Sequence, residues 1–136
     1  MAIFVATDYK ITLNGTNLSS YLTHAELKIS ANDVTTTSFG GSYVTRVAGL
    51  KEGSVSLTFN QDFAASSGID ATIYPLVGTL GTVVIYPTSS AVGSANPAYT
   101  AVVSIIDYSP FASNIGDLAT FSVTWPTSGV ISRATA

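Results

Sequence analysis

Asp33-Val-Thr-Thr-Thr-Ser-Phe-Gly-Gly-Ser-Tyr-Val-Thr-Arg-Val-Ala-Gly-Leu-Lys-Glu-Gly53 lies between two segments that alternate like β-strands. The stretch itself keeps neither the two-residue period of a strand nor the 3.6-residue period of a helix. Disordered segments combine low hydrophobicity with high charge. This stretch, in contrast, contains many apolar residues, and its positive and negative charges balance. Loops of about 20 residues are uncommon in compact domains and are usually functional. We therefore predict a loop that becomes ordered against another molecule.

The segments on either side of residues 33–53 have the pattern of half-buried strands. Apolar residues alternate with polar ones from Ala25 to Ile29 and again from Val55 to Phe59. These two strands are the expected legs of a long hairpin whose tip is 33–53. Their polar faces carry His24, Glu26, Lys28, Ser54, Ser56 and Thr58.

Four further strands are predicted along the chain, at 9–13, 82–86, 99–108 and 118–126, with a weak strand signal at Val130–Ile131. The run 102–106 is apolar on both faces, so we expect both of its faces to be covered. One short helix is expected within 60–77, because Ile69, Ile73, Leu76 and Val77 share one helical face. Ser66, Ser67 and Asp70 are its candidate N-caps, and Pro75 limits its length.

Residues 1–136 are therefore expected to form a single, mainly β domain. The expected architecture is a β-sandwich or partly closed barrel of about six to seven strands, with one short flanking α-helix and a long hairpin loop. A chain of 136 residues can bury roughly two-thirds of its unfolded surface. It contains no cysteine, which excludes thiolate chemistry and thiolate metal sites.

The surface composition points to self-association. Only 10% of the residues are charged, against about 25% in a typical soluble domain, and the mean hydropathy is +0.41. The net charge is −3 and no basic stripe exists, so ordinary attractive phosphate binding is not expected. A passage through which nucleic acid slides without sticking would also lack such a stripe. The first residues do not resemble a signal peptide, and no apolar run is long enough to span a bilayer, so we expect a soluble protein made in the cytoplasm.

The candidates for chemistry each have a simpler structural explanation. His24 is the only histidine, and it lies on a polar strand face without identifiable partners. Asp62 and Asp70 could form a hydrolytic carboxylate pair, but a turn residue and a helix cap explain them better. Trp125 with Tyr99 and Tyr108 could form a sugar-binding platform, yet strand spacing places Trp125 in the core. Phosphate-loop, nucleophile-elbow and dinucleotide patterns are absent. We predict a protein that is not an enzyme and needs no cofactor or metal.

An ordered set of motifs resembles the tail tube, or major tail, proteins of long non-contractile-tailed bacteriophages (siphophages). Its first half contains Asp33-Val-Thr-Thr-Thr-Ser-Phe-Gly, the run from Gly49 to Phe63, and Asp70-Ala-Thr-Ile-Tyr-Pro-Leu-Val-Gly78. Pro87-Thr-Ser-Ser-Ala, Asn96-Pro-Ala-Tyr-Thr100 and the run from Gly116 to Thr127 follow in the same order. The likeness covers nearly the whole chain.

This resemblance implies a structural virion protein that self-assembles into hexameric rings. The rings stack head to tail into a tube, the conduit that delivers the viral genome to the host. The loop 33–53 would contact the neighbouring ring, and the polar faces of its flanking strands, from His24 to Lys28 and from Ser54 to Thr58, would face the lumen. The implied inter-ring contact residues are Phe39, Tyr43, Val44, Arg46, Val47, Leu50 and Lys51.

The resemblance also implies partners and a location. The partners would be other copies of the chain, a tape-measure protein, and tail-tip and terminator proteins, while viral DNA would pass through the lumen without specific binding. Assembly would take place in the bacterial host cytoplasm, and the mature location would be the virion tail. Two alternatives stay open: a monomeric β-sandwich binding or adhesion module, and a tail-end cap or head–tail joining protein that forms one ring and stops.

Overall fold

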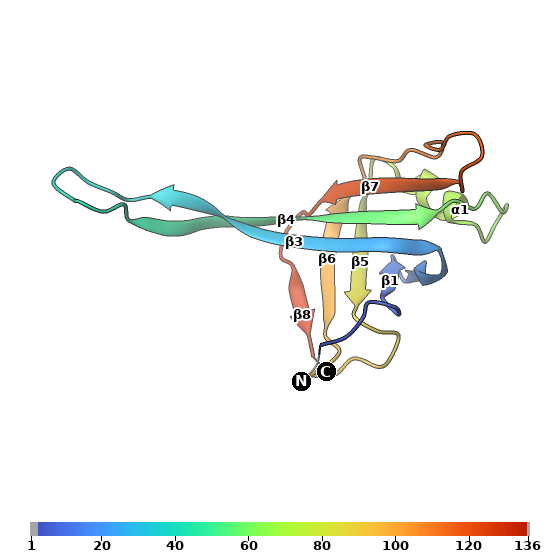
Figure 1. The fold of residues 1–136 in the computed structure, drawn as a ribbon, viewed down its shortest axis with the longest axis horizontal. Coiled ribbons are helices and arrows are strands. Elements are labelled where there is room, and N and C mark those ends of the chain that lie inside the picture. The colour runs from blue at the N-terminus through green and yellow to red at the C-terminus, as the bar shows by residue number, and fades with distance from the viewer. Residues whose placement is uncertain (1–2, 136) are drawn as a thin grey trace.

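The computed structural model describes residues 3–135 and shows two antiparallel β-sheets packed face to face, with a long two-stranded ribbon projecting from one of them (Figure 1). The fold is mainly β, and neither sheet closes into a barrel, so the sandwich alternative holds. The strands of one sheet run across those of the other (Figure 1). Crossed packing of this kind leaves parts of each sheet uncovered by its partner.

The first sheet contains five strands in the order β2-β1-β5-β6-β8. Their bounds are β1 Lys10–Leu13, β2 Thr16–Asn17, β5 Leu80–Tyr86, β6 Ala98–Ser104 and β8 Ser132–Ala134. The second sheet has the order β3-β4-β7, with β3 Leu22–Thr35, β4 Arg46–Asn60 and β7 Thr120–Pro126. The six strands expected around 9–13, 25–29, 55–59, 82–86, 99–108 and 118–126 are present, and two very short strands, β2 and β8, raise the number to eight.

The hydrophobic core fills the space between the two sheets. Several strands alternate buried and accessible positions, as in β7, where Phe121, Val123 and Trp125 are buried. Trp125 is fully buried, and its indole Nε1 donates a hydrogen bond of 2.8 Å to the carbonyl of Asp107. The prediction that Trp125 belongs to the core is confirmed, which removes it from any exposed sugar platform.

The helical segment is shorter than its apolar pattern suggested. Helix α1 spans Ile69–Ile73 and continues as a single 3-10 turn, η2 (Tyr74–Leu76), with Pro75 inside it. Another 3-10 turn, η1 (Ser19–Tyr21), precedes β3. The predicted caps of α1 are wrong: its N-cap is Gly68, with no side-chain cap bond, and Asp70 lies in the first turn. Asp70 instead accepts a hydrogen bond from the hydroxyl of Tyr108.

The prediction that residues 33–53 form a structureless loop is wrong for most of the stretch. Strands β3 and β4 stay paired out to Thr35 and Arg46, so only 36–45 form the loop (Figure 1). The register changes between Ala31, which pairs with Lys51, and Asp33, which pairs with Ala48. An interval of two residues on β3 is therefore paired with an interval of three residues on β4, which is a β-bulge. This extra residue breaks the two-residue period, and the sequence pattern was misread for that reason.

Two expectations about strand ends also need correction. The strand expected at 99–108 ends at Ser104, and the run 102–106 is not covered on both faces, because Ile106 is 63% exposed. The signal at Val130–Ile131 marks the approach to β8 rather than a strand. Ile131 packs against the core from beside the sheet.

Candidate functional site: the projecting ribbon and the polar sheet face

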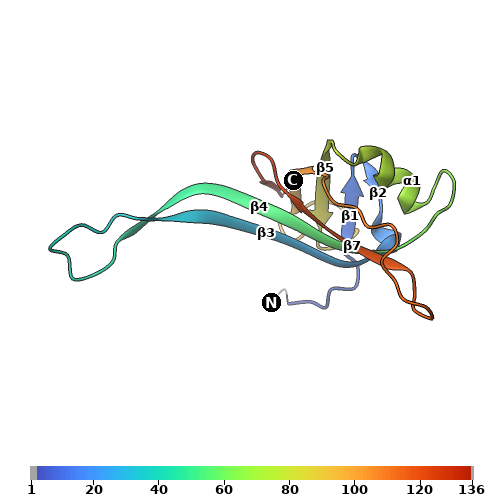
Figure 2. The same cartoon turned by 90° about the horizontal axis from the view of Figure 1, so that it is seen from above.

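The outer halves of β3 and β4, with the loop between them, form a ribbon that extends well beyond the sandwich (Figure 2). We call residues 31–51 the ribbon. Its end is strongly apolar and fully accessible: Phe39 is 108% exposed and Tyr43 86%. Val44, Val47 and Leu50 are exposed as well. All the apolar candidates for inter-ring contact therefore lie on one projecting element, which makes no contact with the sandwich at its tip.

The ribbon is held in shape by its own polar groups. Arg46 Nη1 forms a salt bridge with Asp33 Oδ2, and the hydroxyls of Thr36 and Thr45 are 2.8 Å apart across the base of the loop. The amide of Thr36 also donates to the carbonyl of Thr45. Together with the cross-strand pairing of β3 and β4, these bonds let the ribbon keep its shape without a covering layer.

The two faces of the ribbon exchange their polarity at the bulge. Within the sandwich, the even-numbered residues of β3 form its polar face and the odd-numbered ones face the core. Beyond the bulge, Val34 continues the polar face of β3 and pairs directly with Val47, while Asp33 and Arg46 form their salt bridge on the opposite face. The face that is polar over the sandwich therefore becomes apolar along the ribbon.

The predicted lumen candidates do lie together on one face of the β3-β4-β7 sheet. Three cross-strand pairs place them side by side: His24 with Thr58, Glu26 with Ser56, and Lys28 with Ser54. Sequence reasoning missed the third strand of this face, which adds Ser122 and Thr124 from β7. The hydroxyls of Ser56 and Thr124 are 2.9 Å apart, as are those of Thr58 and Ser122.

This polar face is rich in hydroxyls and poor in net charge. Glu26 and Lys28 have opposite charges, and His24 Nε2 lies 4.0 Å from Glu26 Oε2. Both of these side chains are more than half exposed, so their interaction is screened by water. The alternation of Thr120, Ser122 and Thr124 was visible in the sequence, but the pairing of β7 with β4 was not.

Neither outer edge of this sheet has a partner strand within residues 3–135, although the Ser113 hydroxyl bonds to the amide and carbonyl of Thr120 at the start of β7. In the order β3-β4-β7, among the residues that the structure describes, β3 and β7 each pair only with β4. Free edges present unpaired amide and carbonyl groups to any other strand that comes near. The sheet can therefore be extended at β3 and at β7.

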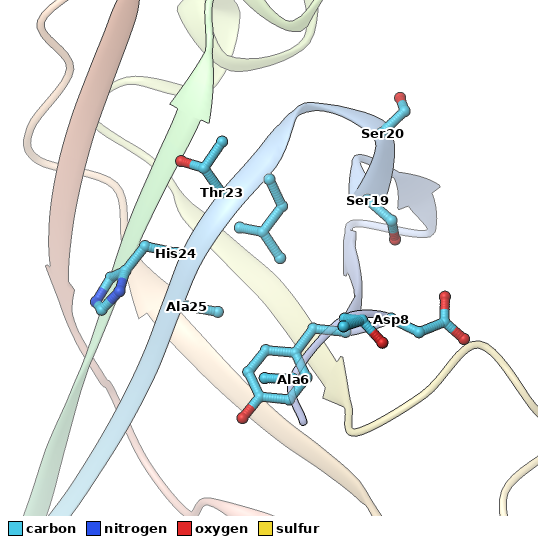
Figure 3. A pocket seen from close by; sticks show the side chains of 10 residues that line it. Ala6, Asp8, Ser19, Ser20, Thr23, His24 and Ala25 are labelled. Atoms are coloured by element: carbon cyan, nitrogen blue, oxygen red, sulfur yellow. The ribbon is translucent and has the colours of Figure 1, made fainter. Parts of the chain in front are cut away.

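A hollow of about 590 Å³ lies between the N-terminal segment 6–9 and the start of β3 (Figure 3). Asp8 lies at its rim, where its carboxylate accepts hydrogen bonds from the Ser89 hydroxyl and amide, at 2.7 and 3.0 Å. These bonds hold the pKa of Asp8 below its usual value. Figure 3 shows the His24 imidazole on the far side of β3 from Asp8, so the hollow does not bring these two groups together.

The two carboxylates considered for hydrolysis are each bound by a tyrosine. The Tyr21 hydroxyl donates to Asp62 Oδ2 at 3.1 Å, and Asp62 Oδ1 accepts from the amide of Ala64, which confirms Asp62 as a turn residue. Tyr108 donates to Asp70. The hydrogen bond to Asp62 raises the pKa of Tyr21, while burial and then the bond to Asp70 raise the pKa of Tyr108 to about 12.

Within residues 3–135 there is no group of three or more His, Cys, Asp or Glu side chains that could hold a metal ion. The same part of the chain has no helix long and apolar enough to cross a membrane.

Comparison with known proteins finds a similar fold in a solved structure. No protein-family model and no curated protein matches the chain. Its fold is similar to that of a chain in a solved structure described as "Virion of native gene transfer agent (GTA) particle", with a TM-score of 0.72. The alignment covers 93% of this chain and 95% of the other, at 13% sequence identity. Nearly complete coverage of both chains means that the whole architecture is shared.

Proposed function

We propose that this chain is a structural virion protein, and specifically a subunit of a tail tube that assembles from stacked hexameric rings. The observation that carries the proposal is the ribbon, a self-paired projection whose apolar end has nothing of its own chain to cover it. Exposed apolar patches of this kind mark interaction sites. The fold likeness to a chain of a gene transfer agent virion supports the same assignment.

Ring formation is supported by the two free edges of the β3-β4-β7 sheet. Because β3 and β7 are both antiparallel to β4, they run in the same direction. Rotation about an axis roughly parallel to these strands would bring β7 of one copy beside β3 of the next copy, as a parallel pair. Such heterologous contacts close into a ring when the rotation closes, and closure removes the exposed edges.

Stacking of the rings is supported by the exchange of polarity along the ribbon. Over the sandwich, the polar face with His24, Glu26 and Lys28 would line a water-filled lumen. Past the bulge, the continuation of that face carries the apolar pair Val34–Val47. Burial of these side chains against another protein surface would be favourable. We infer that the ribbon passes onto the neighbouring ring, where the predicted inter-ring residues from Phe39 to Lys51 are buried.

The composition of the polar face suits a conduit. Its hydroxyls and the balanced pair Glu26 and Lys28 offer no run of cations, so DNA phosphates would gain little by binding there. The implied partners are a tape-measure protein inside the tube and the tail-tip and terminator proteins at its ends. The implied location is the virion tail, after assembly in the host cytoplasm.

Sedimentation and electron microscopy across a concentration series test this proposal. We expect ring-sized particles and tubes of uniform diameter as the concentration rises. A chain that stays monomeric at every concentration, even with tail-initiating components supplied, contradicts the proposal. Rings that never stack under the same conditions favour the alternative of a tail-end cap or head–tail joining protein.

A further inference from the structure

The end of the sandwich opposite the ribbon carries a patch of exposed apolar side chains. The strand register defines the two ends: Asn60 pairs with Thr120 at one, and the ribbon leaves the other beyond the pair Ala31–Lys51. The segment that follows β4 and the segment that precedes β7 meet at the end opposite the ribbon (Figure 1). They contain four large apolar side chains, each more than half exposed, which we call the distal patch: Phe63, Phe111, Ile115 and Leu118.

Hydrogen bonds hold the two segments of the distal patch together. The backbone amide of Gln61 donates to the carbonyl of Ala119 at 2.9 Å, and its side-chain Nε2 donates to the carbonyl of Pro110 at 3.0 Å. The rings of Phe63 and Phe111 stack on each other, with their centroids 5.4 Å apart. The patch is therefore preformed, and a partner that binds it would have little ordering cost to overcome.

A stack of rings would bring the ribbon of another copy to this patch. An axis roughly parallel to β3, β4 and β7 directs the ribbon toward the next ring. Because all copies in a head-to-tail stack point the same way, the end of the next ring that meets the ribbon is the one with the distal patch. At about 3.3 Å per residue, the stretch from Ala31 to Gly40 reaches up to roughly 30 Å beyond the sandwich, which is enough to lie across that end.

The apolar areas of the two surfaces are comparable. The ribbon has six exposed large apolar side chains: Val34, Phe39, Tyr43, Val44, Val47 and Leu50. Burial of the four side chains of the distal patch would remove on the order of 600 Å² from water on that side. A standard protein interface buries about 800 Å² per partner, so apolar contact would supply most of the area that a stable interface needs.

The charges of the two surfaces have opposite signs. The segments 60–78 and 108–120 contain three acidic residues and no basic one: Asp62, Asp70 and Asp117. The ribbon has a net charge of +1, because Arg46 and Lys51 outnumber Asp33. Lys51 lies where the ribbon leaves the sandwich, at the end that faces the acidic segments of the next ring. Opposite charges favour contact between ribbon and patch over contact between two patches.

We propose that the distal patch of each copy is the docking site for the ribbon of a copy in the neighbouring ring. The inference rests on the proposed stack of rings, and it names the surface that the ribbon contacts. Each ring then contributes ribbons to one neighbour and patches to the other. The two ends of a tube therefore differ, since one has free ribbons and the other has free patches.

Serine substitutions in the distal patch test this contact. The patch variant carries Phe111→Ser and Ile115→Ser, and these side chains are 85% and 105% exposed, so circular dichroism and the urea midpoint should stay unchanged. Rings should form as they do from the intact chain. The concentration at which they stack should rise roughly tenfold or more, because apolar contact is lost. Ile115→Ser alone gives the same test, with a smaller effect, if the double variant does not form rings.

Val5→Ser is the matched control for the patch variant. Val5 is 79% exposed, and it belongs to the N-terminal segment, which lies away from the distal patch in Figure 1. We expect this variant to stack at the same concentration as the intact chain.

Mixing two kinds of ring tests the pairing of ribbon and patch. Rings of the patch variant have ribbons but lack the docking site. Rings of a chain with Asn-Gly in place of residues 32–50 have the docking site but lack the ribbon. The two are assembled separately, mixed, and imaged by electron microscopy. We expect stacks of two rings and none longer, because neither ring of such a pair can add a third.

The outcomes separate this inference from the proposed function. Tubes from the patch variant at the concentration that suffices for the intact chain would overturn the docking site and leave the tail tube proposal standing. A mixture that stays as single rings, while the intact chain forms tubes, would do the same. Failure of the intact chain to assemble at any concentration contradicts both.

Discussion

Gly53 lies where the ribbon leaves the sandwich, and its surroundings leave no room for a side chain. A Cβ at this position would lie 2.5 Å from the carbonyl oxygen of Lys28 and 2.7 Å from Ile131 Cδ1. We expect Gly53→Ala to lower the free energy of unfolding by about 1–3 kcal/mol, because backbone or core must shift. Urea denaturation measures the change. Gly93→Ala is the matched control, since its Cβ would meet nothing within 4 Å, and an equal loss in both variants would argue against crowding at Gly53.

Trp125 is the only tryptophan, so its fluorescence reports on one site. Because the indole is fully buried, we expect blue-shifted emission that resists a soluble quencher. Trp125→Phe would leave the carbonyl of Asp107 without its donor and should destabilise the domain by about 1–3 kcal/mol. Red-shifted, readily quenched emission would contradict the burial and revive the binding-platform alternative.

Tyr108 gives the domain a sensitivity to alkaline pH. Its pKa of about 12 is above the ordinary value of 10, so the unfolded chain releases this proton at lower pH than the folded chain does. Stability from Tyr108 is therefore fully present below pH 10 and is lost as the pH rises toward 12. Urea midpoints measured between pH 9 and 12, a range chosen to bracket these values, should fall less steeply in Tyr108→Phe. Parallel curves for the two proteins would contradict this account.

At the scale of elements, the sequence was readable wherever one face of a strand is buried. The alternation at 25–29, 55–59 and 118–126 placed β3, β4 and β7 correctly, since burial imposes a period of two. The ribbon was misread because the bulge inserts one residue into β4 and because neither ribbon face meets the core. The helix was overextended because Leu76 and Val77 keep the helical spacing after Pro75 has ended α1.

The candidate site was predicted only as far as local pairing allows. A hairpin brings its own legs together, so the three cross-strand pairs from His24–Thr58 to Lys28–Ser54 could be expected from the sequence. Ser122 lies 64 residues after its hydroxyl partner Thr58, and Thr124 lies 68 residues after its partner Ser56. No local pattern specifies that pairing, and it depends on how the whole sheet folds.

The ribbon should be dispensable for folding. Replacing residues 32–50 with Asn-Gly joins the paired residues Ala31 and Lys51 through a two-residue turn that hairpins favour. Since the core residues of β3 and β4 end at Leu27 and Val55, we expect a folded monomer whose stability changes by about 1 kcal/mol or less. Circular dichroism and urea denaturation measure this. Loss of the fold would mean that the ribbon is part of the core structure.

At the scale of the whole molecule, many of the exposed apolar groups are clustered. One cluster lies on the ribbon and another along residues 105–118 by β7, while the β3-β4-β7 sheet keeps a polar outer face. This distribution suits a subunit with one lateral contact, one axial contact and one solvent-exposed face. It also accounts for a surface with few charges, since copies of the chain would cover much of it.

Electron microscopy of the intact chain beside the variant that lacks residues 32–50 tests the central claim most directly. Both proteins would be concentrated under the same conditions and imaged without further treatment. The account predicts stacked tubes of uniform diameter from the intact chain and isolated rings from the variant, because the lateral surfaces remain and the axial contact is gone. Tubes of the same length and diameter from both proteins would contradict it.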